Sequence, residues 1–564
     1  MNLPRFAPLS ITALAGLAAA ASAWAQQPAS MSPATQGSAP GAVRCSALAA
    51  GRFPDVEIVS AALQPALVPV PGSKLPAMMP GLPAGPDIAG LPAFCRVVGR
   101  IHPEAGSDIR FEVWMPSEGW DGRLNGGNSG GFAGYINYMD LAGAVRAGQA
   151  GVATDTGHEA HPVTGDWAKG RPERIRDYGW RGVHLSTVVG KALVAGYYGR
   201  GPRHSYFIGC SNGGRQALME ASRFPEDYDG IVAGAPASVW TDVALSMINT
   251  VQAQLPPGAR IRASQLPLLQ SEVIAQCDAL DGQVDGLVAD PRKCRLEVAR
   301  LACGTRTSPE CFSPAQIGAL QRIQAGARDA SGRPVGYGYP ASGAEVGNPV
   351  PAFGWDGWIT GTPTDAASHA AYPAEILGNF IAQPFATVAS FDFNTDPARL
   401  RAALAGDLDA EPKMDRFFRR GGKLIIWHGW GDSAISPLLS IDFYRAILRN
   451  GGPETRDSVR LFMIPGLQHC AGGTGVSAFG QMSAPAPGDG PEQSVGAAIQ
   501  AWVEQGRRPE SLIGHKAMPM SLGGAPSPGN KQRLICAFPA EAVLRAGADA
   551  DQAASYRCRE PGQG

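Results

Sequence analysis

The stretch HSYFIGCSNGGRQALMEASRFP, which runs from His204 to Pro225, decides the fold. Its first residues are typical of a β-strand, and those after the glycine pair are typical of a helix. At the corner stands Gly209-Cys-Ser211-Asn-Gly213, a G-x-S-x-G motif. Such a corner lifts a serine hydroxyl clear of a parallel sheet, where it can act as a nucleophile. The simpler interpretation is that Ser211 only caps the helix that follows it.

A second G-x-S-x-G motif surrounds Ser129, between Gly127 and Gly131. The glycine-rich segment NGGNSGGFAG around it predicts a loop, without the strand and helix that a nucleophile corner needs. A tetrahedral reaction intermediate requires two backbone N–H donors. We expect Asn212, the residue after the nucleophile, to supply one donor and this early loop to supply the other.

An acidic residue and a histidine should follow the nucleophile, each after a later strand. KLIIWHGWGDSAISP predicts a strand whose exit loop carries Asp432, and VRLFMIPGLQHCAGG predicts the next strand, with His469 in its loop. The histidine would accept the serine proton, and the carboxylate would hold the imidazole in the productive tautomer. His428 is the rival base but precedes Asp432, and His158 precedes the nucleophile. His428 is interpreted as a residue that packs or orders its loop, and His158 as part of the loop structure, with pocket lining as its alternative.

Strand-like and helix-like segments alternate from residue 93 to about 236 and again from residue 423, which predicts an α/β fold with a mostly parallel sheet. Between about 240 and 420 the alternation is lost, and proline and glycine are frequent. We therefore expect one α/β domain, formed by residues 45–239 and 421–564, that is interrupted by a long insertion over residues 240–420.

The 564-residue chain carries 48 basic and 49 acidic residues, a balance that does not favour binding to nucleic acid or to anionic membranes. Its start is typical of a signal peptide, with Arg5 before an apolar run and Ala23-Trp-Ala25 as the cleavage site. We expect residues 1–25 to be removed and residues 26–44 to form a flexible lead. An uncleaved anchor helix is the alternative, but the apolar run is short. The mature protein is then periplasmic or extracellular.

The ten cysteines are even in number and contain no C-x-x-C motif, which in an exported chain indicates disulfides before metal sites. Spacing alone leaves the connectivity open. The alternative for Cys210 and Cys470 is that each is a free, buried cysteine that packs as a small apolar residue. The plausible local pairs are Cys277/Cys294, Cys303/Cys311 and Cys536/Cys558.

The segments GCSNGGRQALMEASRFPEDYDGIVAGAPA, HGWGDSAISP and PGLQHCAGG resemble the tannase and feruloyl esterase family of serine hydrolases. The resemblance covers nearly the whole mature chain. It implies an α/β-hydrolase core with a large lid domain inserted over residues 240–420. It also implies that the cysteine beside the nucleophile pairs with the cysteine beside the histidine. The implied functional residues are Ser211, Asp432 and His469 for catalysis and Gly131 and Asn212 as oxyanion donors. The implied disulfides are Cys45–Cys95, Cys210–Cys470, Cys277–Cys294, Cys303–Cys311 and Cys536–Cys558.

The segment CDALDGQVDGLVADPRKC gathers aspartates in a glycine-bent loop. Carboxylate oxygens suit calcium, but the spacing is not that of an EF-hand, and an acidic solvated turn is the alternative. The family resemblance implies a structural calcium ion at this place in the lid, and no organic cofactor is expected. The implied ligands are Asp278, Asp281 and Asp285, with the backbone carbonyls of Gln283 and Leu287.

The resemblance implies a small aromatic ester as substrate: a galloyl, feruloyl or other hydroxycinnamoyl ester, or mono(2-hydroxyethyl) terephthalate or a related phthalate monoester. The terephthalate enzymes of the family hold the free carboxylate with a lid arginine. This chain has no lysine or arginine between Arg333 and Arg399, which favours an uncharged phenolic acyl group transferred through an acyl-enzyme.

Phe380 and Phe385 are candidates for stacking on the substrate ring, with core packing as the alternative. A non-catalytic binding protein on the same fold and a peptidase are the alternatives from other functional classes. The sequence does not indicate an oligomeric state.

Overall fold

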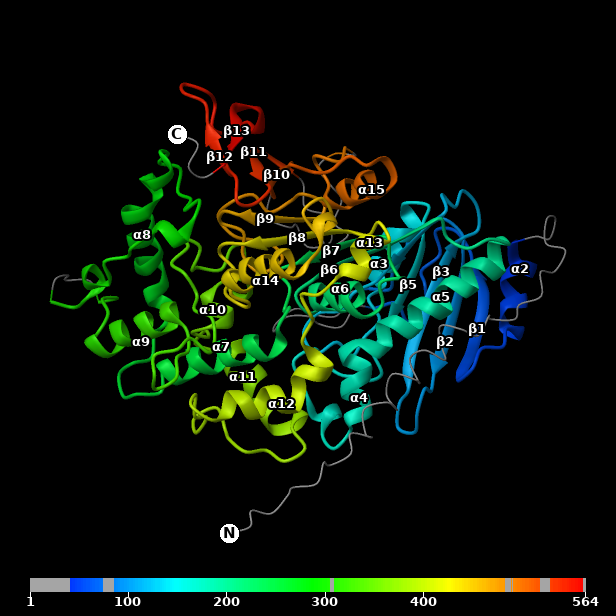
Figure 1. Ribbon diagram of the computed structural model, residues 1–564, viewed down its shortest axis with the longest axis horizontal. Coiled ribbons are helices and arrows are strands. Elements are labelled where there is room, and N and C mark those ends of the chain that lie inside the picture. The colour runs from blue at the N-terminus through cyan, green and yellow to red at the C-terminus, as the bar shows by residue number, and fades with distance from the viewer. Residues whose placement is uncertain are drawn as a thin grey trace, which may run out of the picture.

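The computed structural model describes residues 41–74, 86–304, 309–481, 488, 490–517 and 528–560 (Figure 1). Within them, one nine-stranded sheet has the order β1-β2-β3-β5-β4-β6-β7-β8-β9. Its strands are β1 (Val56–Gln64), β2 (Phe94–Ile101), β3 (Ile109–Pro116), β4 (Arg123–Gly126), β5 (Ala150–Thr154), β6 (His204–Cys210), β7 (Gly230–Gly234), β8 (Lys423–Gly429) and β9 (Val459–Ile464).

The predicted parallel sheet is found from β5 to β9, where every neighbouring pair is parallel. The other end differs, because β1, β2 and β3 pair antiparallel with one another, and β3 pairs antiparallel with β5. The segment between β2 and β3 is only residues 102–108, too short for the crossover that parallel neighbours require. The α/β-hydrolase core therefore carries an antiparallel extension at one edge.

Helices cover both faces of the sheet. Side chains alternate along β6, so that Phe207 packs with helix α6 on one face and Tyr206 packs with helix α15 on the other. Helices α5 and α14 lie on the Phe207 face, and α3 packs on the opposite face. The bounds of these helices are α3 (Tyr138–Arg146), α5 (Gly182–Tyr198), α6 (Asn212–Arg223), α14 (Pro437–Asn450) and α15 (Val495–Gln505).

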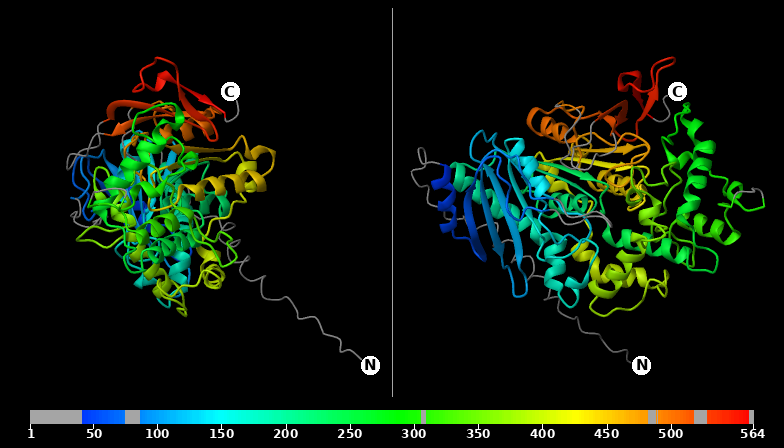
Figure 2. Two further views of the ribbon diagram at one scale, coloured as in Figure 1. Left: turned by 90° about the vertical axis from the view of Figure 1, so that its left-hand side faces the viewer. Right: turned by 180° about the vertical axis from the view of Figure 1, so that it is seen from behind.

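In the described part of the long segment between β7 and β8, the regular elements are helices, and β-pairing is limited to isolated bridges. Most of its α-helices gather on the side of the molecule away from β1 and β2, as both Figure 1 and the rear view of Figure 2 show. They are α7 (Trp240–Ala253), α8 (Leu266–Cys277), α9 (Pro314–Ala325), α10 (Trp355–Trp358), α11 (Ser368–Glu375) and α12 (Asp396–Leu408). The last helix of the segment, α13 (Asp415–Arg419), packs against α6 in the core.

Two small hairpins complete the C-terminal part, β10 (Ser511–Ala517) with β11 (Pro528–Cys536) and β12 (Glu541–Leu544) with β13 (Tyr556–Arg559). At the other end, the predicted signal peptide and the first part of the lead lie outside the described residues. Residues 41–44, expected in the lead, form the start of helix α2 (Gly41–Ala47), which packs on β1. None of the helices in the described ranges is both long and apolar enough to cross a membrane.

Candidate active site

Ser211 sits at the corner between β6 and α6 with φ 63° and ψ −124°, a backbone conformation that few non-glycine residues adopt. The flanking glycines make the corner sterically feasible. A Cβ atom at Gly209 would overlap the backbone of Gly213, and one at Gly213 would overlap Asn128. The Ser211 hydroxyl makes no capping hydrogen bond to α6. The interpretation of this serine as a helix cap is therefore wrong.

The structure brings Ser211, His469 and Asp432 into one hydrogen-bonded chain. His469 Nε2 lies 2.9 Å from Ser211 Oγ, and His469 Nδ1 lies 2.7 Å from Asp432 Oδ2. An ionised carboxylate can only accept, so Nδ1 carries the proton and Nε2 is left to accept the serine proton. Burial raises the pKa of Asp432, but the charges and hydrogen bonds of His469 and His428 outweigh burial and hold that pKa below its usual range.

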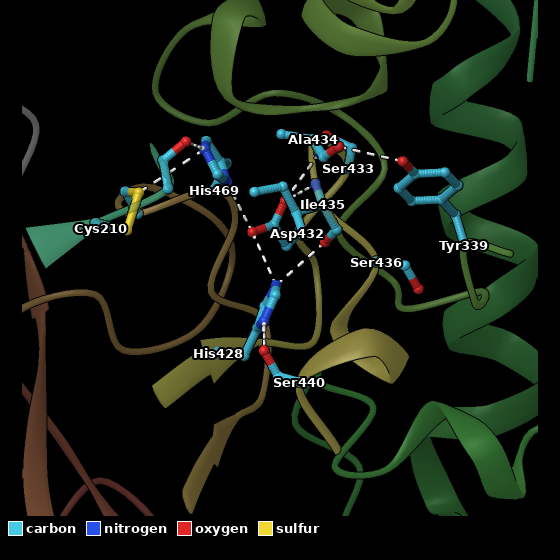
Figure 3. Close-up of polar contacts among 12 residues, drawn as sticks. Cys210, Tyr339, His428, Asp432, Ser433, Ala434, Ile435, Ser436, Ser440 and His469 are labelled. Atoms are coloured by element: carbon cyan, nitrogen blue, oxygen red, sulfur yellow. Dashed lines mark hydrogen bonds and ion pairs between the residues drawn. A yellow bond between two sulfur atoms is a disulfide. The ribbon is translucent and has the colours of Figure 1, made fainter. Parts of the chain in front are cut away.

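His428 lies on the far side of Asp432 from His469 (Figure 3). Its Nε2 is 3.1 Å from both Asp432 Oδ2 and the Ile435 carbonyl oxygen, and its Nδ1 is 2.7 Å from Ser440 Oγ. Because both partners of Nε2 are acceptors, Nε2 donates and Nδ1 accepts from the Ser440 hydroxyl. His428 therefore orients the carboxylate, in agreement with its interpretation as a loop-ordering residue.

The loop that holds the second serine motif lies against the start of α6. Ser129 is buried, and its hydroxyl accepts from Gln216 Nε2 at 3.1 Å. The Ser129 carbonyl accepts from Asn212 Nδ2 at 3.0 Å. Gly131 has φ +57°, and a Cβ there would clash with Pro162 and the Tyr372 hydroxyl. Asn212 opens α6, so its backbone N–H has no acceptor within its own helix.

Two residues that the sequence reasoning missed hold this loop and Asn212 together. The Tyr178 hydroxyl is 3.1 Å from the Gly131 carbonyl oxygen and 3.0 Å from Asn212 Oδ1. Arg215 is fully buried, stacks on the Tyr178 ring and donates from Nε to Asn212 Oδ1 at 2.9 Å. Its remaining donors reach the carbonyls of Gly179 and Tyr178. The signal in the sequence was a charged residue three positions after Asn212, on the buried face of α6.

All ten cysteines are paired. The pairs are Cys45–Cys95, Cys210–Cys470, Cys277–Cys294, Cys303–Cys311 and Cys536–Cys558, the set that the resemblance implied. Cys210 directly precedes Ser211 and Cys470 directly follows His469. Their disulfide, which Figure 3 shows beside His469, therefore ties the serine loop to the histidine loop.

Comparisons with known proteins agree with this geometry. The sequence model of a family described as "Tannase and feruloyl esterase" matches residues 95–559. The chain belongs to the tannase and feruloyl esterase family. It is a carboxylic ester hydrolase with the α/β-hydrolase fold, as predicted, and the alternative of a non-catalytic binding protein finds no support.

Individual members of the family match this esterase over most of its length. An uncharacterised esterase of Xanthomonas campestris is 36% identical over 86% of this chain and 87% of its own. The mono(2-hydroxyethyl) terephthalate hydrolase of Piscinibacter sakaiensis is 30% identical over 85% of this chain and 87% of its own. The crystal structure of feruloyl esterase B from Aspergillus oryzae superimposes with a TM-score of 0.78 at 27% identity, and the match covers 92% of this chain and all of that one.

The inserted segment of this esterase contacts the acid loop. Tyr339 OH donates to the Ala434 carbonyl at 3.1 Å, and His369 Nε2 lies 3.3 Å from the same oxygen. The Ala434 N–H in turn donates to Asp432 Oδ1 at 2.8 Å. Burial lowers the pKa of His369 to about 3, so this imidazole is neutral at neutral pH. The insertion therefore supports the orientation of the carboxylate as well as covering the core.

An aromatic side chain of the insertion packs against His469, and a second packs behind it. The Trp358 ring meets the His469 ring edge to face, with centroids 5.2 Å apart, and stacks with Tyr372 at 6.1 Å. Phe380 is 3% exposed and packs between Phe132 and Trp240, so the core-packing interpretation describes it. Phe385 lies under the Arg399 guanidinium, which is 4.0 Å from its ring centre.

His158 lies outside the hydrogen-bonded chain of Ser211. It is buried, stacks on Trp167 with centroids 3.7 Å apart and places Nε2 2.8 Å from the Phe132 carbonyl oxygen. Burial lowers the pKa of His158 to about 3. It orders the loop that contains Gly131, as its place in the sequence suggested.

The aspartate loop has the hydrogen bonding of a folded turn. Asp278 accepts from the backbone N–H groups of Asp285, Gly286 and Leu287, and Asp281 accepts from that of Gln283. Asp285 forms an ion pair with Arg533. Burial, followed by the negative charges of Asp285 and Asp278, raises the pKa of Asp281. The loop thus concentrates hard oxygen donors whose charges repel one another.

Replacing Tyr178 with phenylalanine is expected to lower kcat about fivefold, with little change in KM. The change keeps the ring under Arg215 but removes the hydroxyl shared by Gly131 and Asn212, a loss worth about 1 kcal/mol. A loosened donor pair weakens the stabilisation of the oxyanion more than the binding of the ester. Steady-state kinetics of the purified variant would test this. Tyr444→Phe, on helix α14 away from Gly131, is the control, and an equal fall in kcat there would contradict the assignment.

Proposed function

We propose that this esterase cleaves esters of uncharged aromatic acids, of the galloyl or hydroxycinnamoyl type, through an acyl-enzyme on Ser211. One observation carries the proposal: Ser211, on a strained strand-to-helix corner, contacts His469, which contacts the buried carboxylate of Asp432. A serine that only stabilises the fold does not need this chain of contacts. The arrangement is the one required for nucleophilic catalysis.

In the first half of the reaction, Ser211 Oγ attacks the ester carbonyl carbon while its proton passes to His469 Nε2. Asp432 holds the Nδ1 proton of the imidazole and stabilises the imidazolium. The backbone N–H groups of Asn212 and Gly131 would donate to the oxyanion. The bond from carbon to the alcohol oxygen then breaks, and His469 gives its proton to the departing alkoxide. Water attacks the acyl-enzyme by the same steps and releases the acid.

The surroundings of His469 support a flat, neutral acyl group. Trp358 and Tyr372 present aromatic surfaces there, and Tyr372 packs against Phe132, the residue after Gly131, with centroids 4.9 Å apart. No lysine or arginine occurs at residues 334–398 to bind a free carboxylate. An aromatic ring gains from stacking and burial at such surfaces, whereas a carboxylate loses hydration without a cation to replace it.

The substrate class is tested by measuring kcat/KM for methyl gallate, methyl ferulate and mono(2-hydroxyethyl) terephthalate side by side. The Piscinibacter relative carries the name of a hydrolase for the third substrate, so that substrate is the competitor. We expect at least one phenolic methyl ester to react faster than the terephthalate monoester. Preference for the terephthalate monoester would overturn the proposal. The amide of ferulic acid tests for peptidase chemistry, and we expect no hydrolysis of it.

We also infer that the esterase is exported to an oxidising compartment. The signal-like residues 1–25 and the five disulfides support this location. Mass spectrometry of the mature protein checks it, with an expected N-terminus at Gln26. Recovery of an intact N-terminus from the membrane fraction would favour the anchor helix instead.

We further infer that the loop between Cys277 and Cys294 binds one structural calcium ion. Its donors support the ion: three aspartates lie within the segment from Asp278 to Asp285, and the pKa of Asp281 is raised partly by the other two. Asp278, Asp281, Asp285 and the carbonyls of Gln283 and Leu287 would hold the ion. Calcium would neutralise these charges and stiffen the turn without taking part in the ester chemistry.

Calcium removal is expected to lower the melting temperature by a few degrees and to leave ester hydrolysis below that temperature intact. An ion at a hundred times its Kd contributes about 2.7 kcal/mol to the folded state, and chelation removes this. Melting curves with and without excess chelator, together with elemental analysis, measure the effect. Asp281→Asn should melt like the chelated protein and no longer respond to calcium. An unchanged melting curve in a protein that contains no metal would refute the calcium site.

A further inference from the structure

A second group of ionisable side chains lies at the end of α6 remote from Ser211. His184 on α5, Glu220 on α6 and Asp227 on the loop before β7 each place a ligating atom within 4.8 Å of the other two. A search of the described ranges for three histidine, cysteine or acidic side chains this close together finds this group. His184 Nδ1 is 2.6 Å from Asp227 Oδ2. Neither the hydrogen-bonded chain at Ser211 nor the aspartate loop uses any of the three.

Glu220 is the unusual member of this group. It is 1% exposed, and no donor among the described residues reaches either of its carboxylate oxygens, although the Asp227 carboxylate lies within hydrogen-bonding reach. A buried carboxylate without a donor is strongly unfavourable unless a cation or a proton neutralises it. Burial, followed by the negative charge of Asp227, raises the pKa of Glu220 well above its usual range. The site therefore lacks positive charge at the point where two carboxylates face each other.

The neighbouring cations bind elsewhere. Lys191 Nζ donates to the Glu226 carbonyl oxygen at 3.0 Å, and Arg420 pairs with the carboxylates of Glu226 and Asp229. The His184 imidazole is stacked flat on the Phe224 ring, with centroids 3.6 Å apart, so its plane is held with Nδ1 towards Asp227. This leaves one oriented nitrogen and two carboxylates. Lys191 acts on Glu220 through its charge, but its described hydrogen bond goes to the Glu226 carbonyl oxygen and not to Glu220.

We propose that His184, Glu220 and Asp227 bind a divalent transition-metal ion, zinc being the ion that this ligand set suits. Two carboxylates neutralise the charge of a divalent ion, and an imidazole nitrogen favours zinc over calcium, which takes oxygen ligands. Three protein ligands leave a fourth position for water, which can enter because the His184 side chain is 16% exposed. Binding needs a neutral imidazole and two ionised carboxylates. Any of these three side chains that carries an extra proton in the metal-free protein therefore releases it when the ion binds.

The ion would cross-link the fold and take no part in ester cleavage. Glu220 lies nine positions after Ser211, about 13 Å along the helix axis at 1.5 Å per residue. A metal at this end would join α5, α6 and the loop that leads to β7. Since α6 carries Ser211 at its start, the cross-link would stabilise the helix that positions the nucleophile.

Zinc titration of the mature protein tests this proposal. The protein is first stripped with chelator and then saturated with calcium, so that the aspartate loop does not contribute. We expect one equivalent of zinc by calorimetry, a higher melting temperature, and a visible absorption band when cobalt replaces zinc. Glu220→Gln should lose all three effects. Glu226→Gln, an exposed carboxylate next to Asp227, is the matched control and should keep them.

Two results would overturn the site. One is zinc binding that persists in Glu220→Gln. The other is a wild-type protein that binds no zinc. If Glu220→Gln then melts at or above the wild-type temperature, a proton shared by Glu220 and Asp227 neutralises these two carboxylates instead. If Glu220→Gln does not fold, His184→Gln serves in its place, because it removes the nitrogen ligand without leaving a new charge. Zinc binding unchanged in that variant would equally reject the proposal.

Discussion

Replacing Ser211 with alanine is expected to lower kcat by at least about 10³-fold and to leave the protein folded. Among the described side chains, the Ser211 hydroxyl hydrogen-bonds to His469, so its removal takes away the nucleophile and little packing. The oxyanion donors and ester binding remain, which accounts for a residual rate above that of water. His469→Ala should be similarly severe. Asp432→Asn should be milder, because the amide disturbs the tautomer but keeps the shape.

A fall in kcat supports the assignment only if the variant is folded, so folding must be measured for each variant. Circular dichroism and melting curves of Ser211→Ala should match those of the wild type. Ser222→Ala is the matched control, since Ser222 lies on the same helix and bonds only to backbone carbonyls of that helix. It should keep wild-type turnover. Combining Ser211→Ala with His469→Ala should cost little more than either change alone, because the residues act as a unit. Near-normal turnover in Ser211→Ala would disprove the assignment of the nucleophile.

Replacing Cys210 and Cys470 together with alanine is expected to lower both stability and activity strongly. The disulfide spans 260 residues of sequence, and the chain-entropy estimate for so long a loop is about 5.5 kcal/mol. The effect on activity should exceed what lost stability explains, because the bond lies between the immediate neighbours of Ser211 and His469. A displacement of about 1 Å between reacting groups can lower the rate about 10²-fold.

The matched control for this change is Cys303→Ala with Cys311→Ala. That disulfide closes a loop of 8 residues in the insertion, for which the same estimate is about 2.5 kcal/mol. The Cys303→Ala/Cys311→Ala variant should melt at a lower temperature than the wild type but keep its rate of ester hydrolysis below that temperature. Tryptic digestion without reduction should yield peptide 204–215 linked to peptide 461–507. Two free thiols in those peptides, or full activity in the Cys210→Ala/Cys470→Ala variant, would contradict the role of this disulfide in holding the serine and histidine loops together.

The parallel part of the sheet was predictable because its strands are buried on both faces and alternate with helices. The antiparallel pairing at the edge of the sheet was not predicted. Strand β4 is only four residues long, Arg123–Gly126, and no periodicity can be recognised in so few positions. The antiparallel pairing of β2 and β3 follows from the short segment 102–108, a signal that was present in the sequence but was not used.

The chemistry of the Ser211 corner was also local in origin. Strand, glycines, serine and helix are neighbours in sequence, and the steric requirement at Gly209 and Gly213 acts within a few residues. The order of Asp432 and His469 after the nucleophile followed from the rule that loops at the carboxyl ends of parallel strands meet at one edge. These features could be predicted because sequence distance and spatial distance coincide, or because topology brings the loops together.

By itself, then, the sequence determined the fold class, the family and the residues expected at the reacting centre, since each depends on local steric rules and on the order of elements. Only the tertiary structure decided how those residues are held. Tyr178 meets Gly131 and Asn212, Tyr339 and His369 meet the loop of Asp432, and Glu220 lies unpartnered beside Asp227. Most of these contacts join segments far apart in sequence, and their geometry depends on side-chain packing that no local pattern encodes.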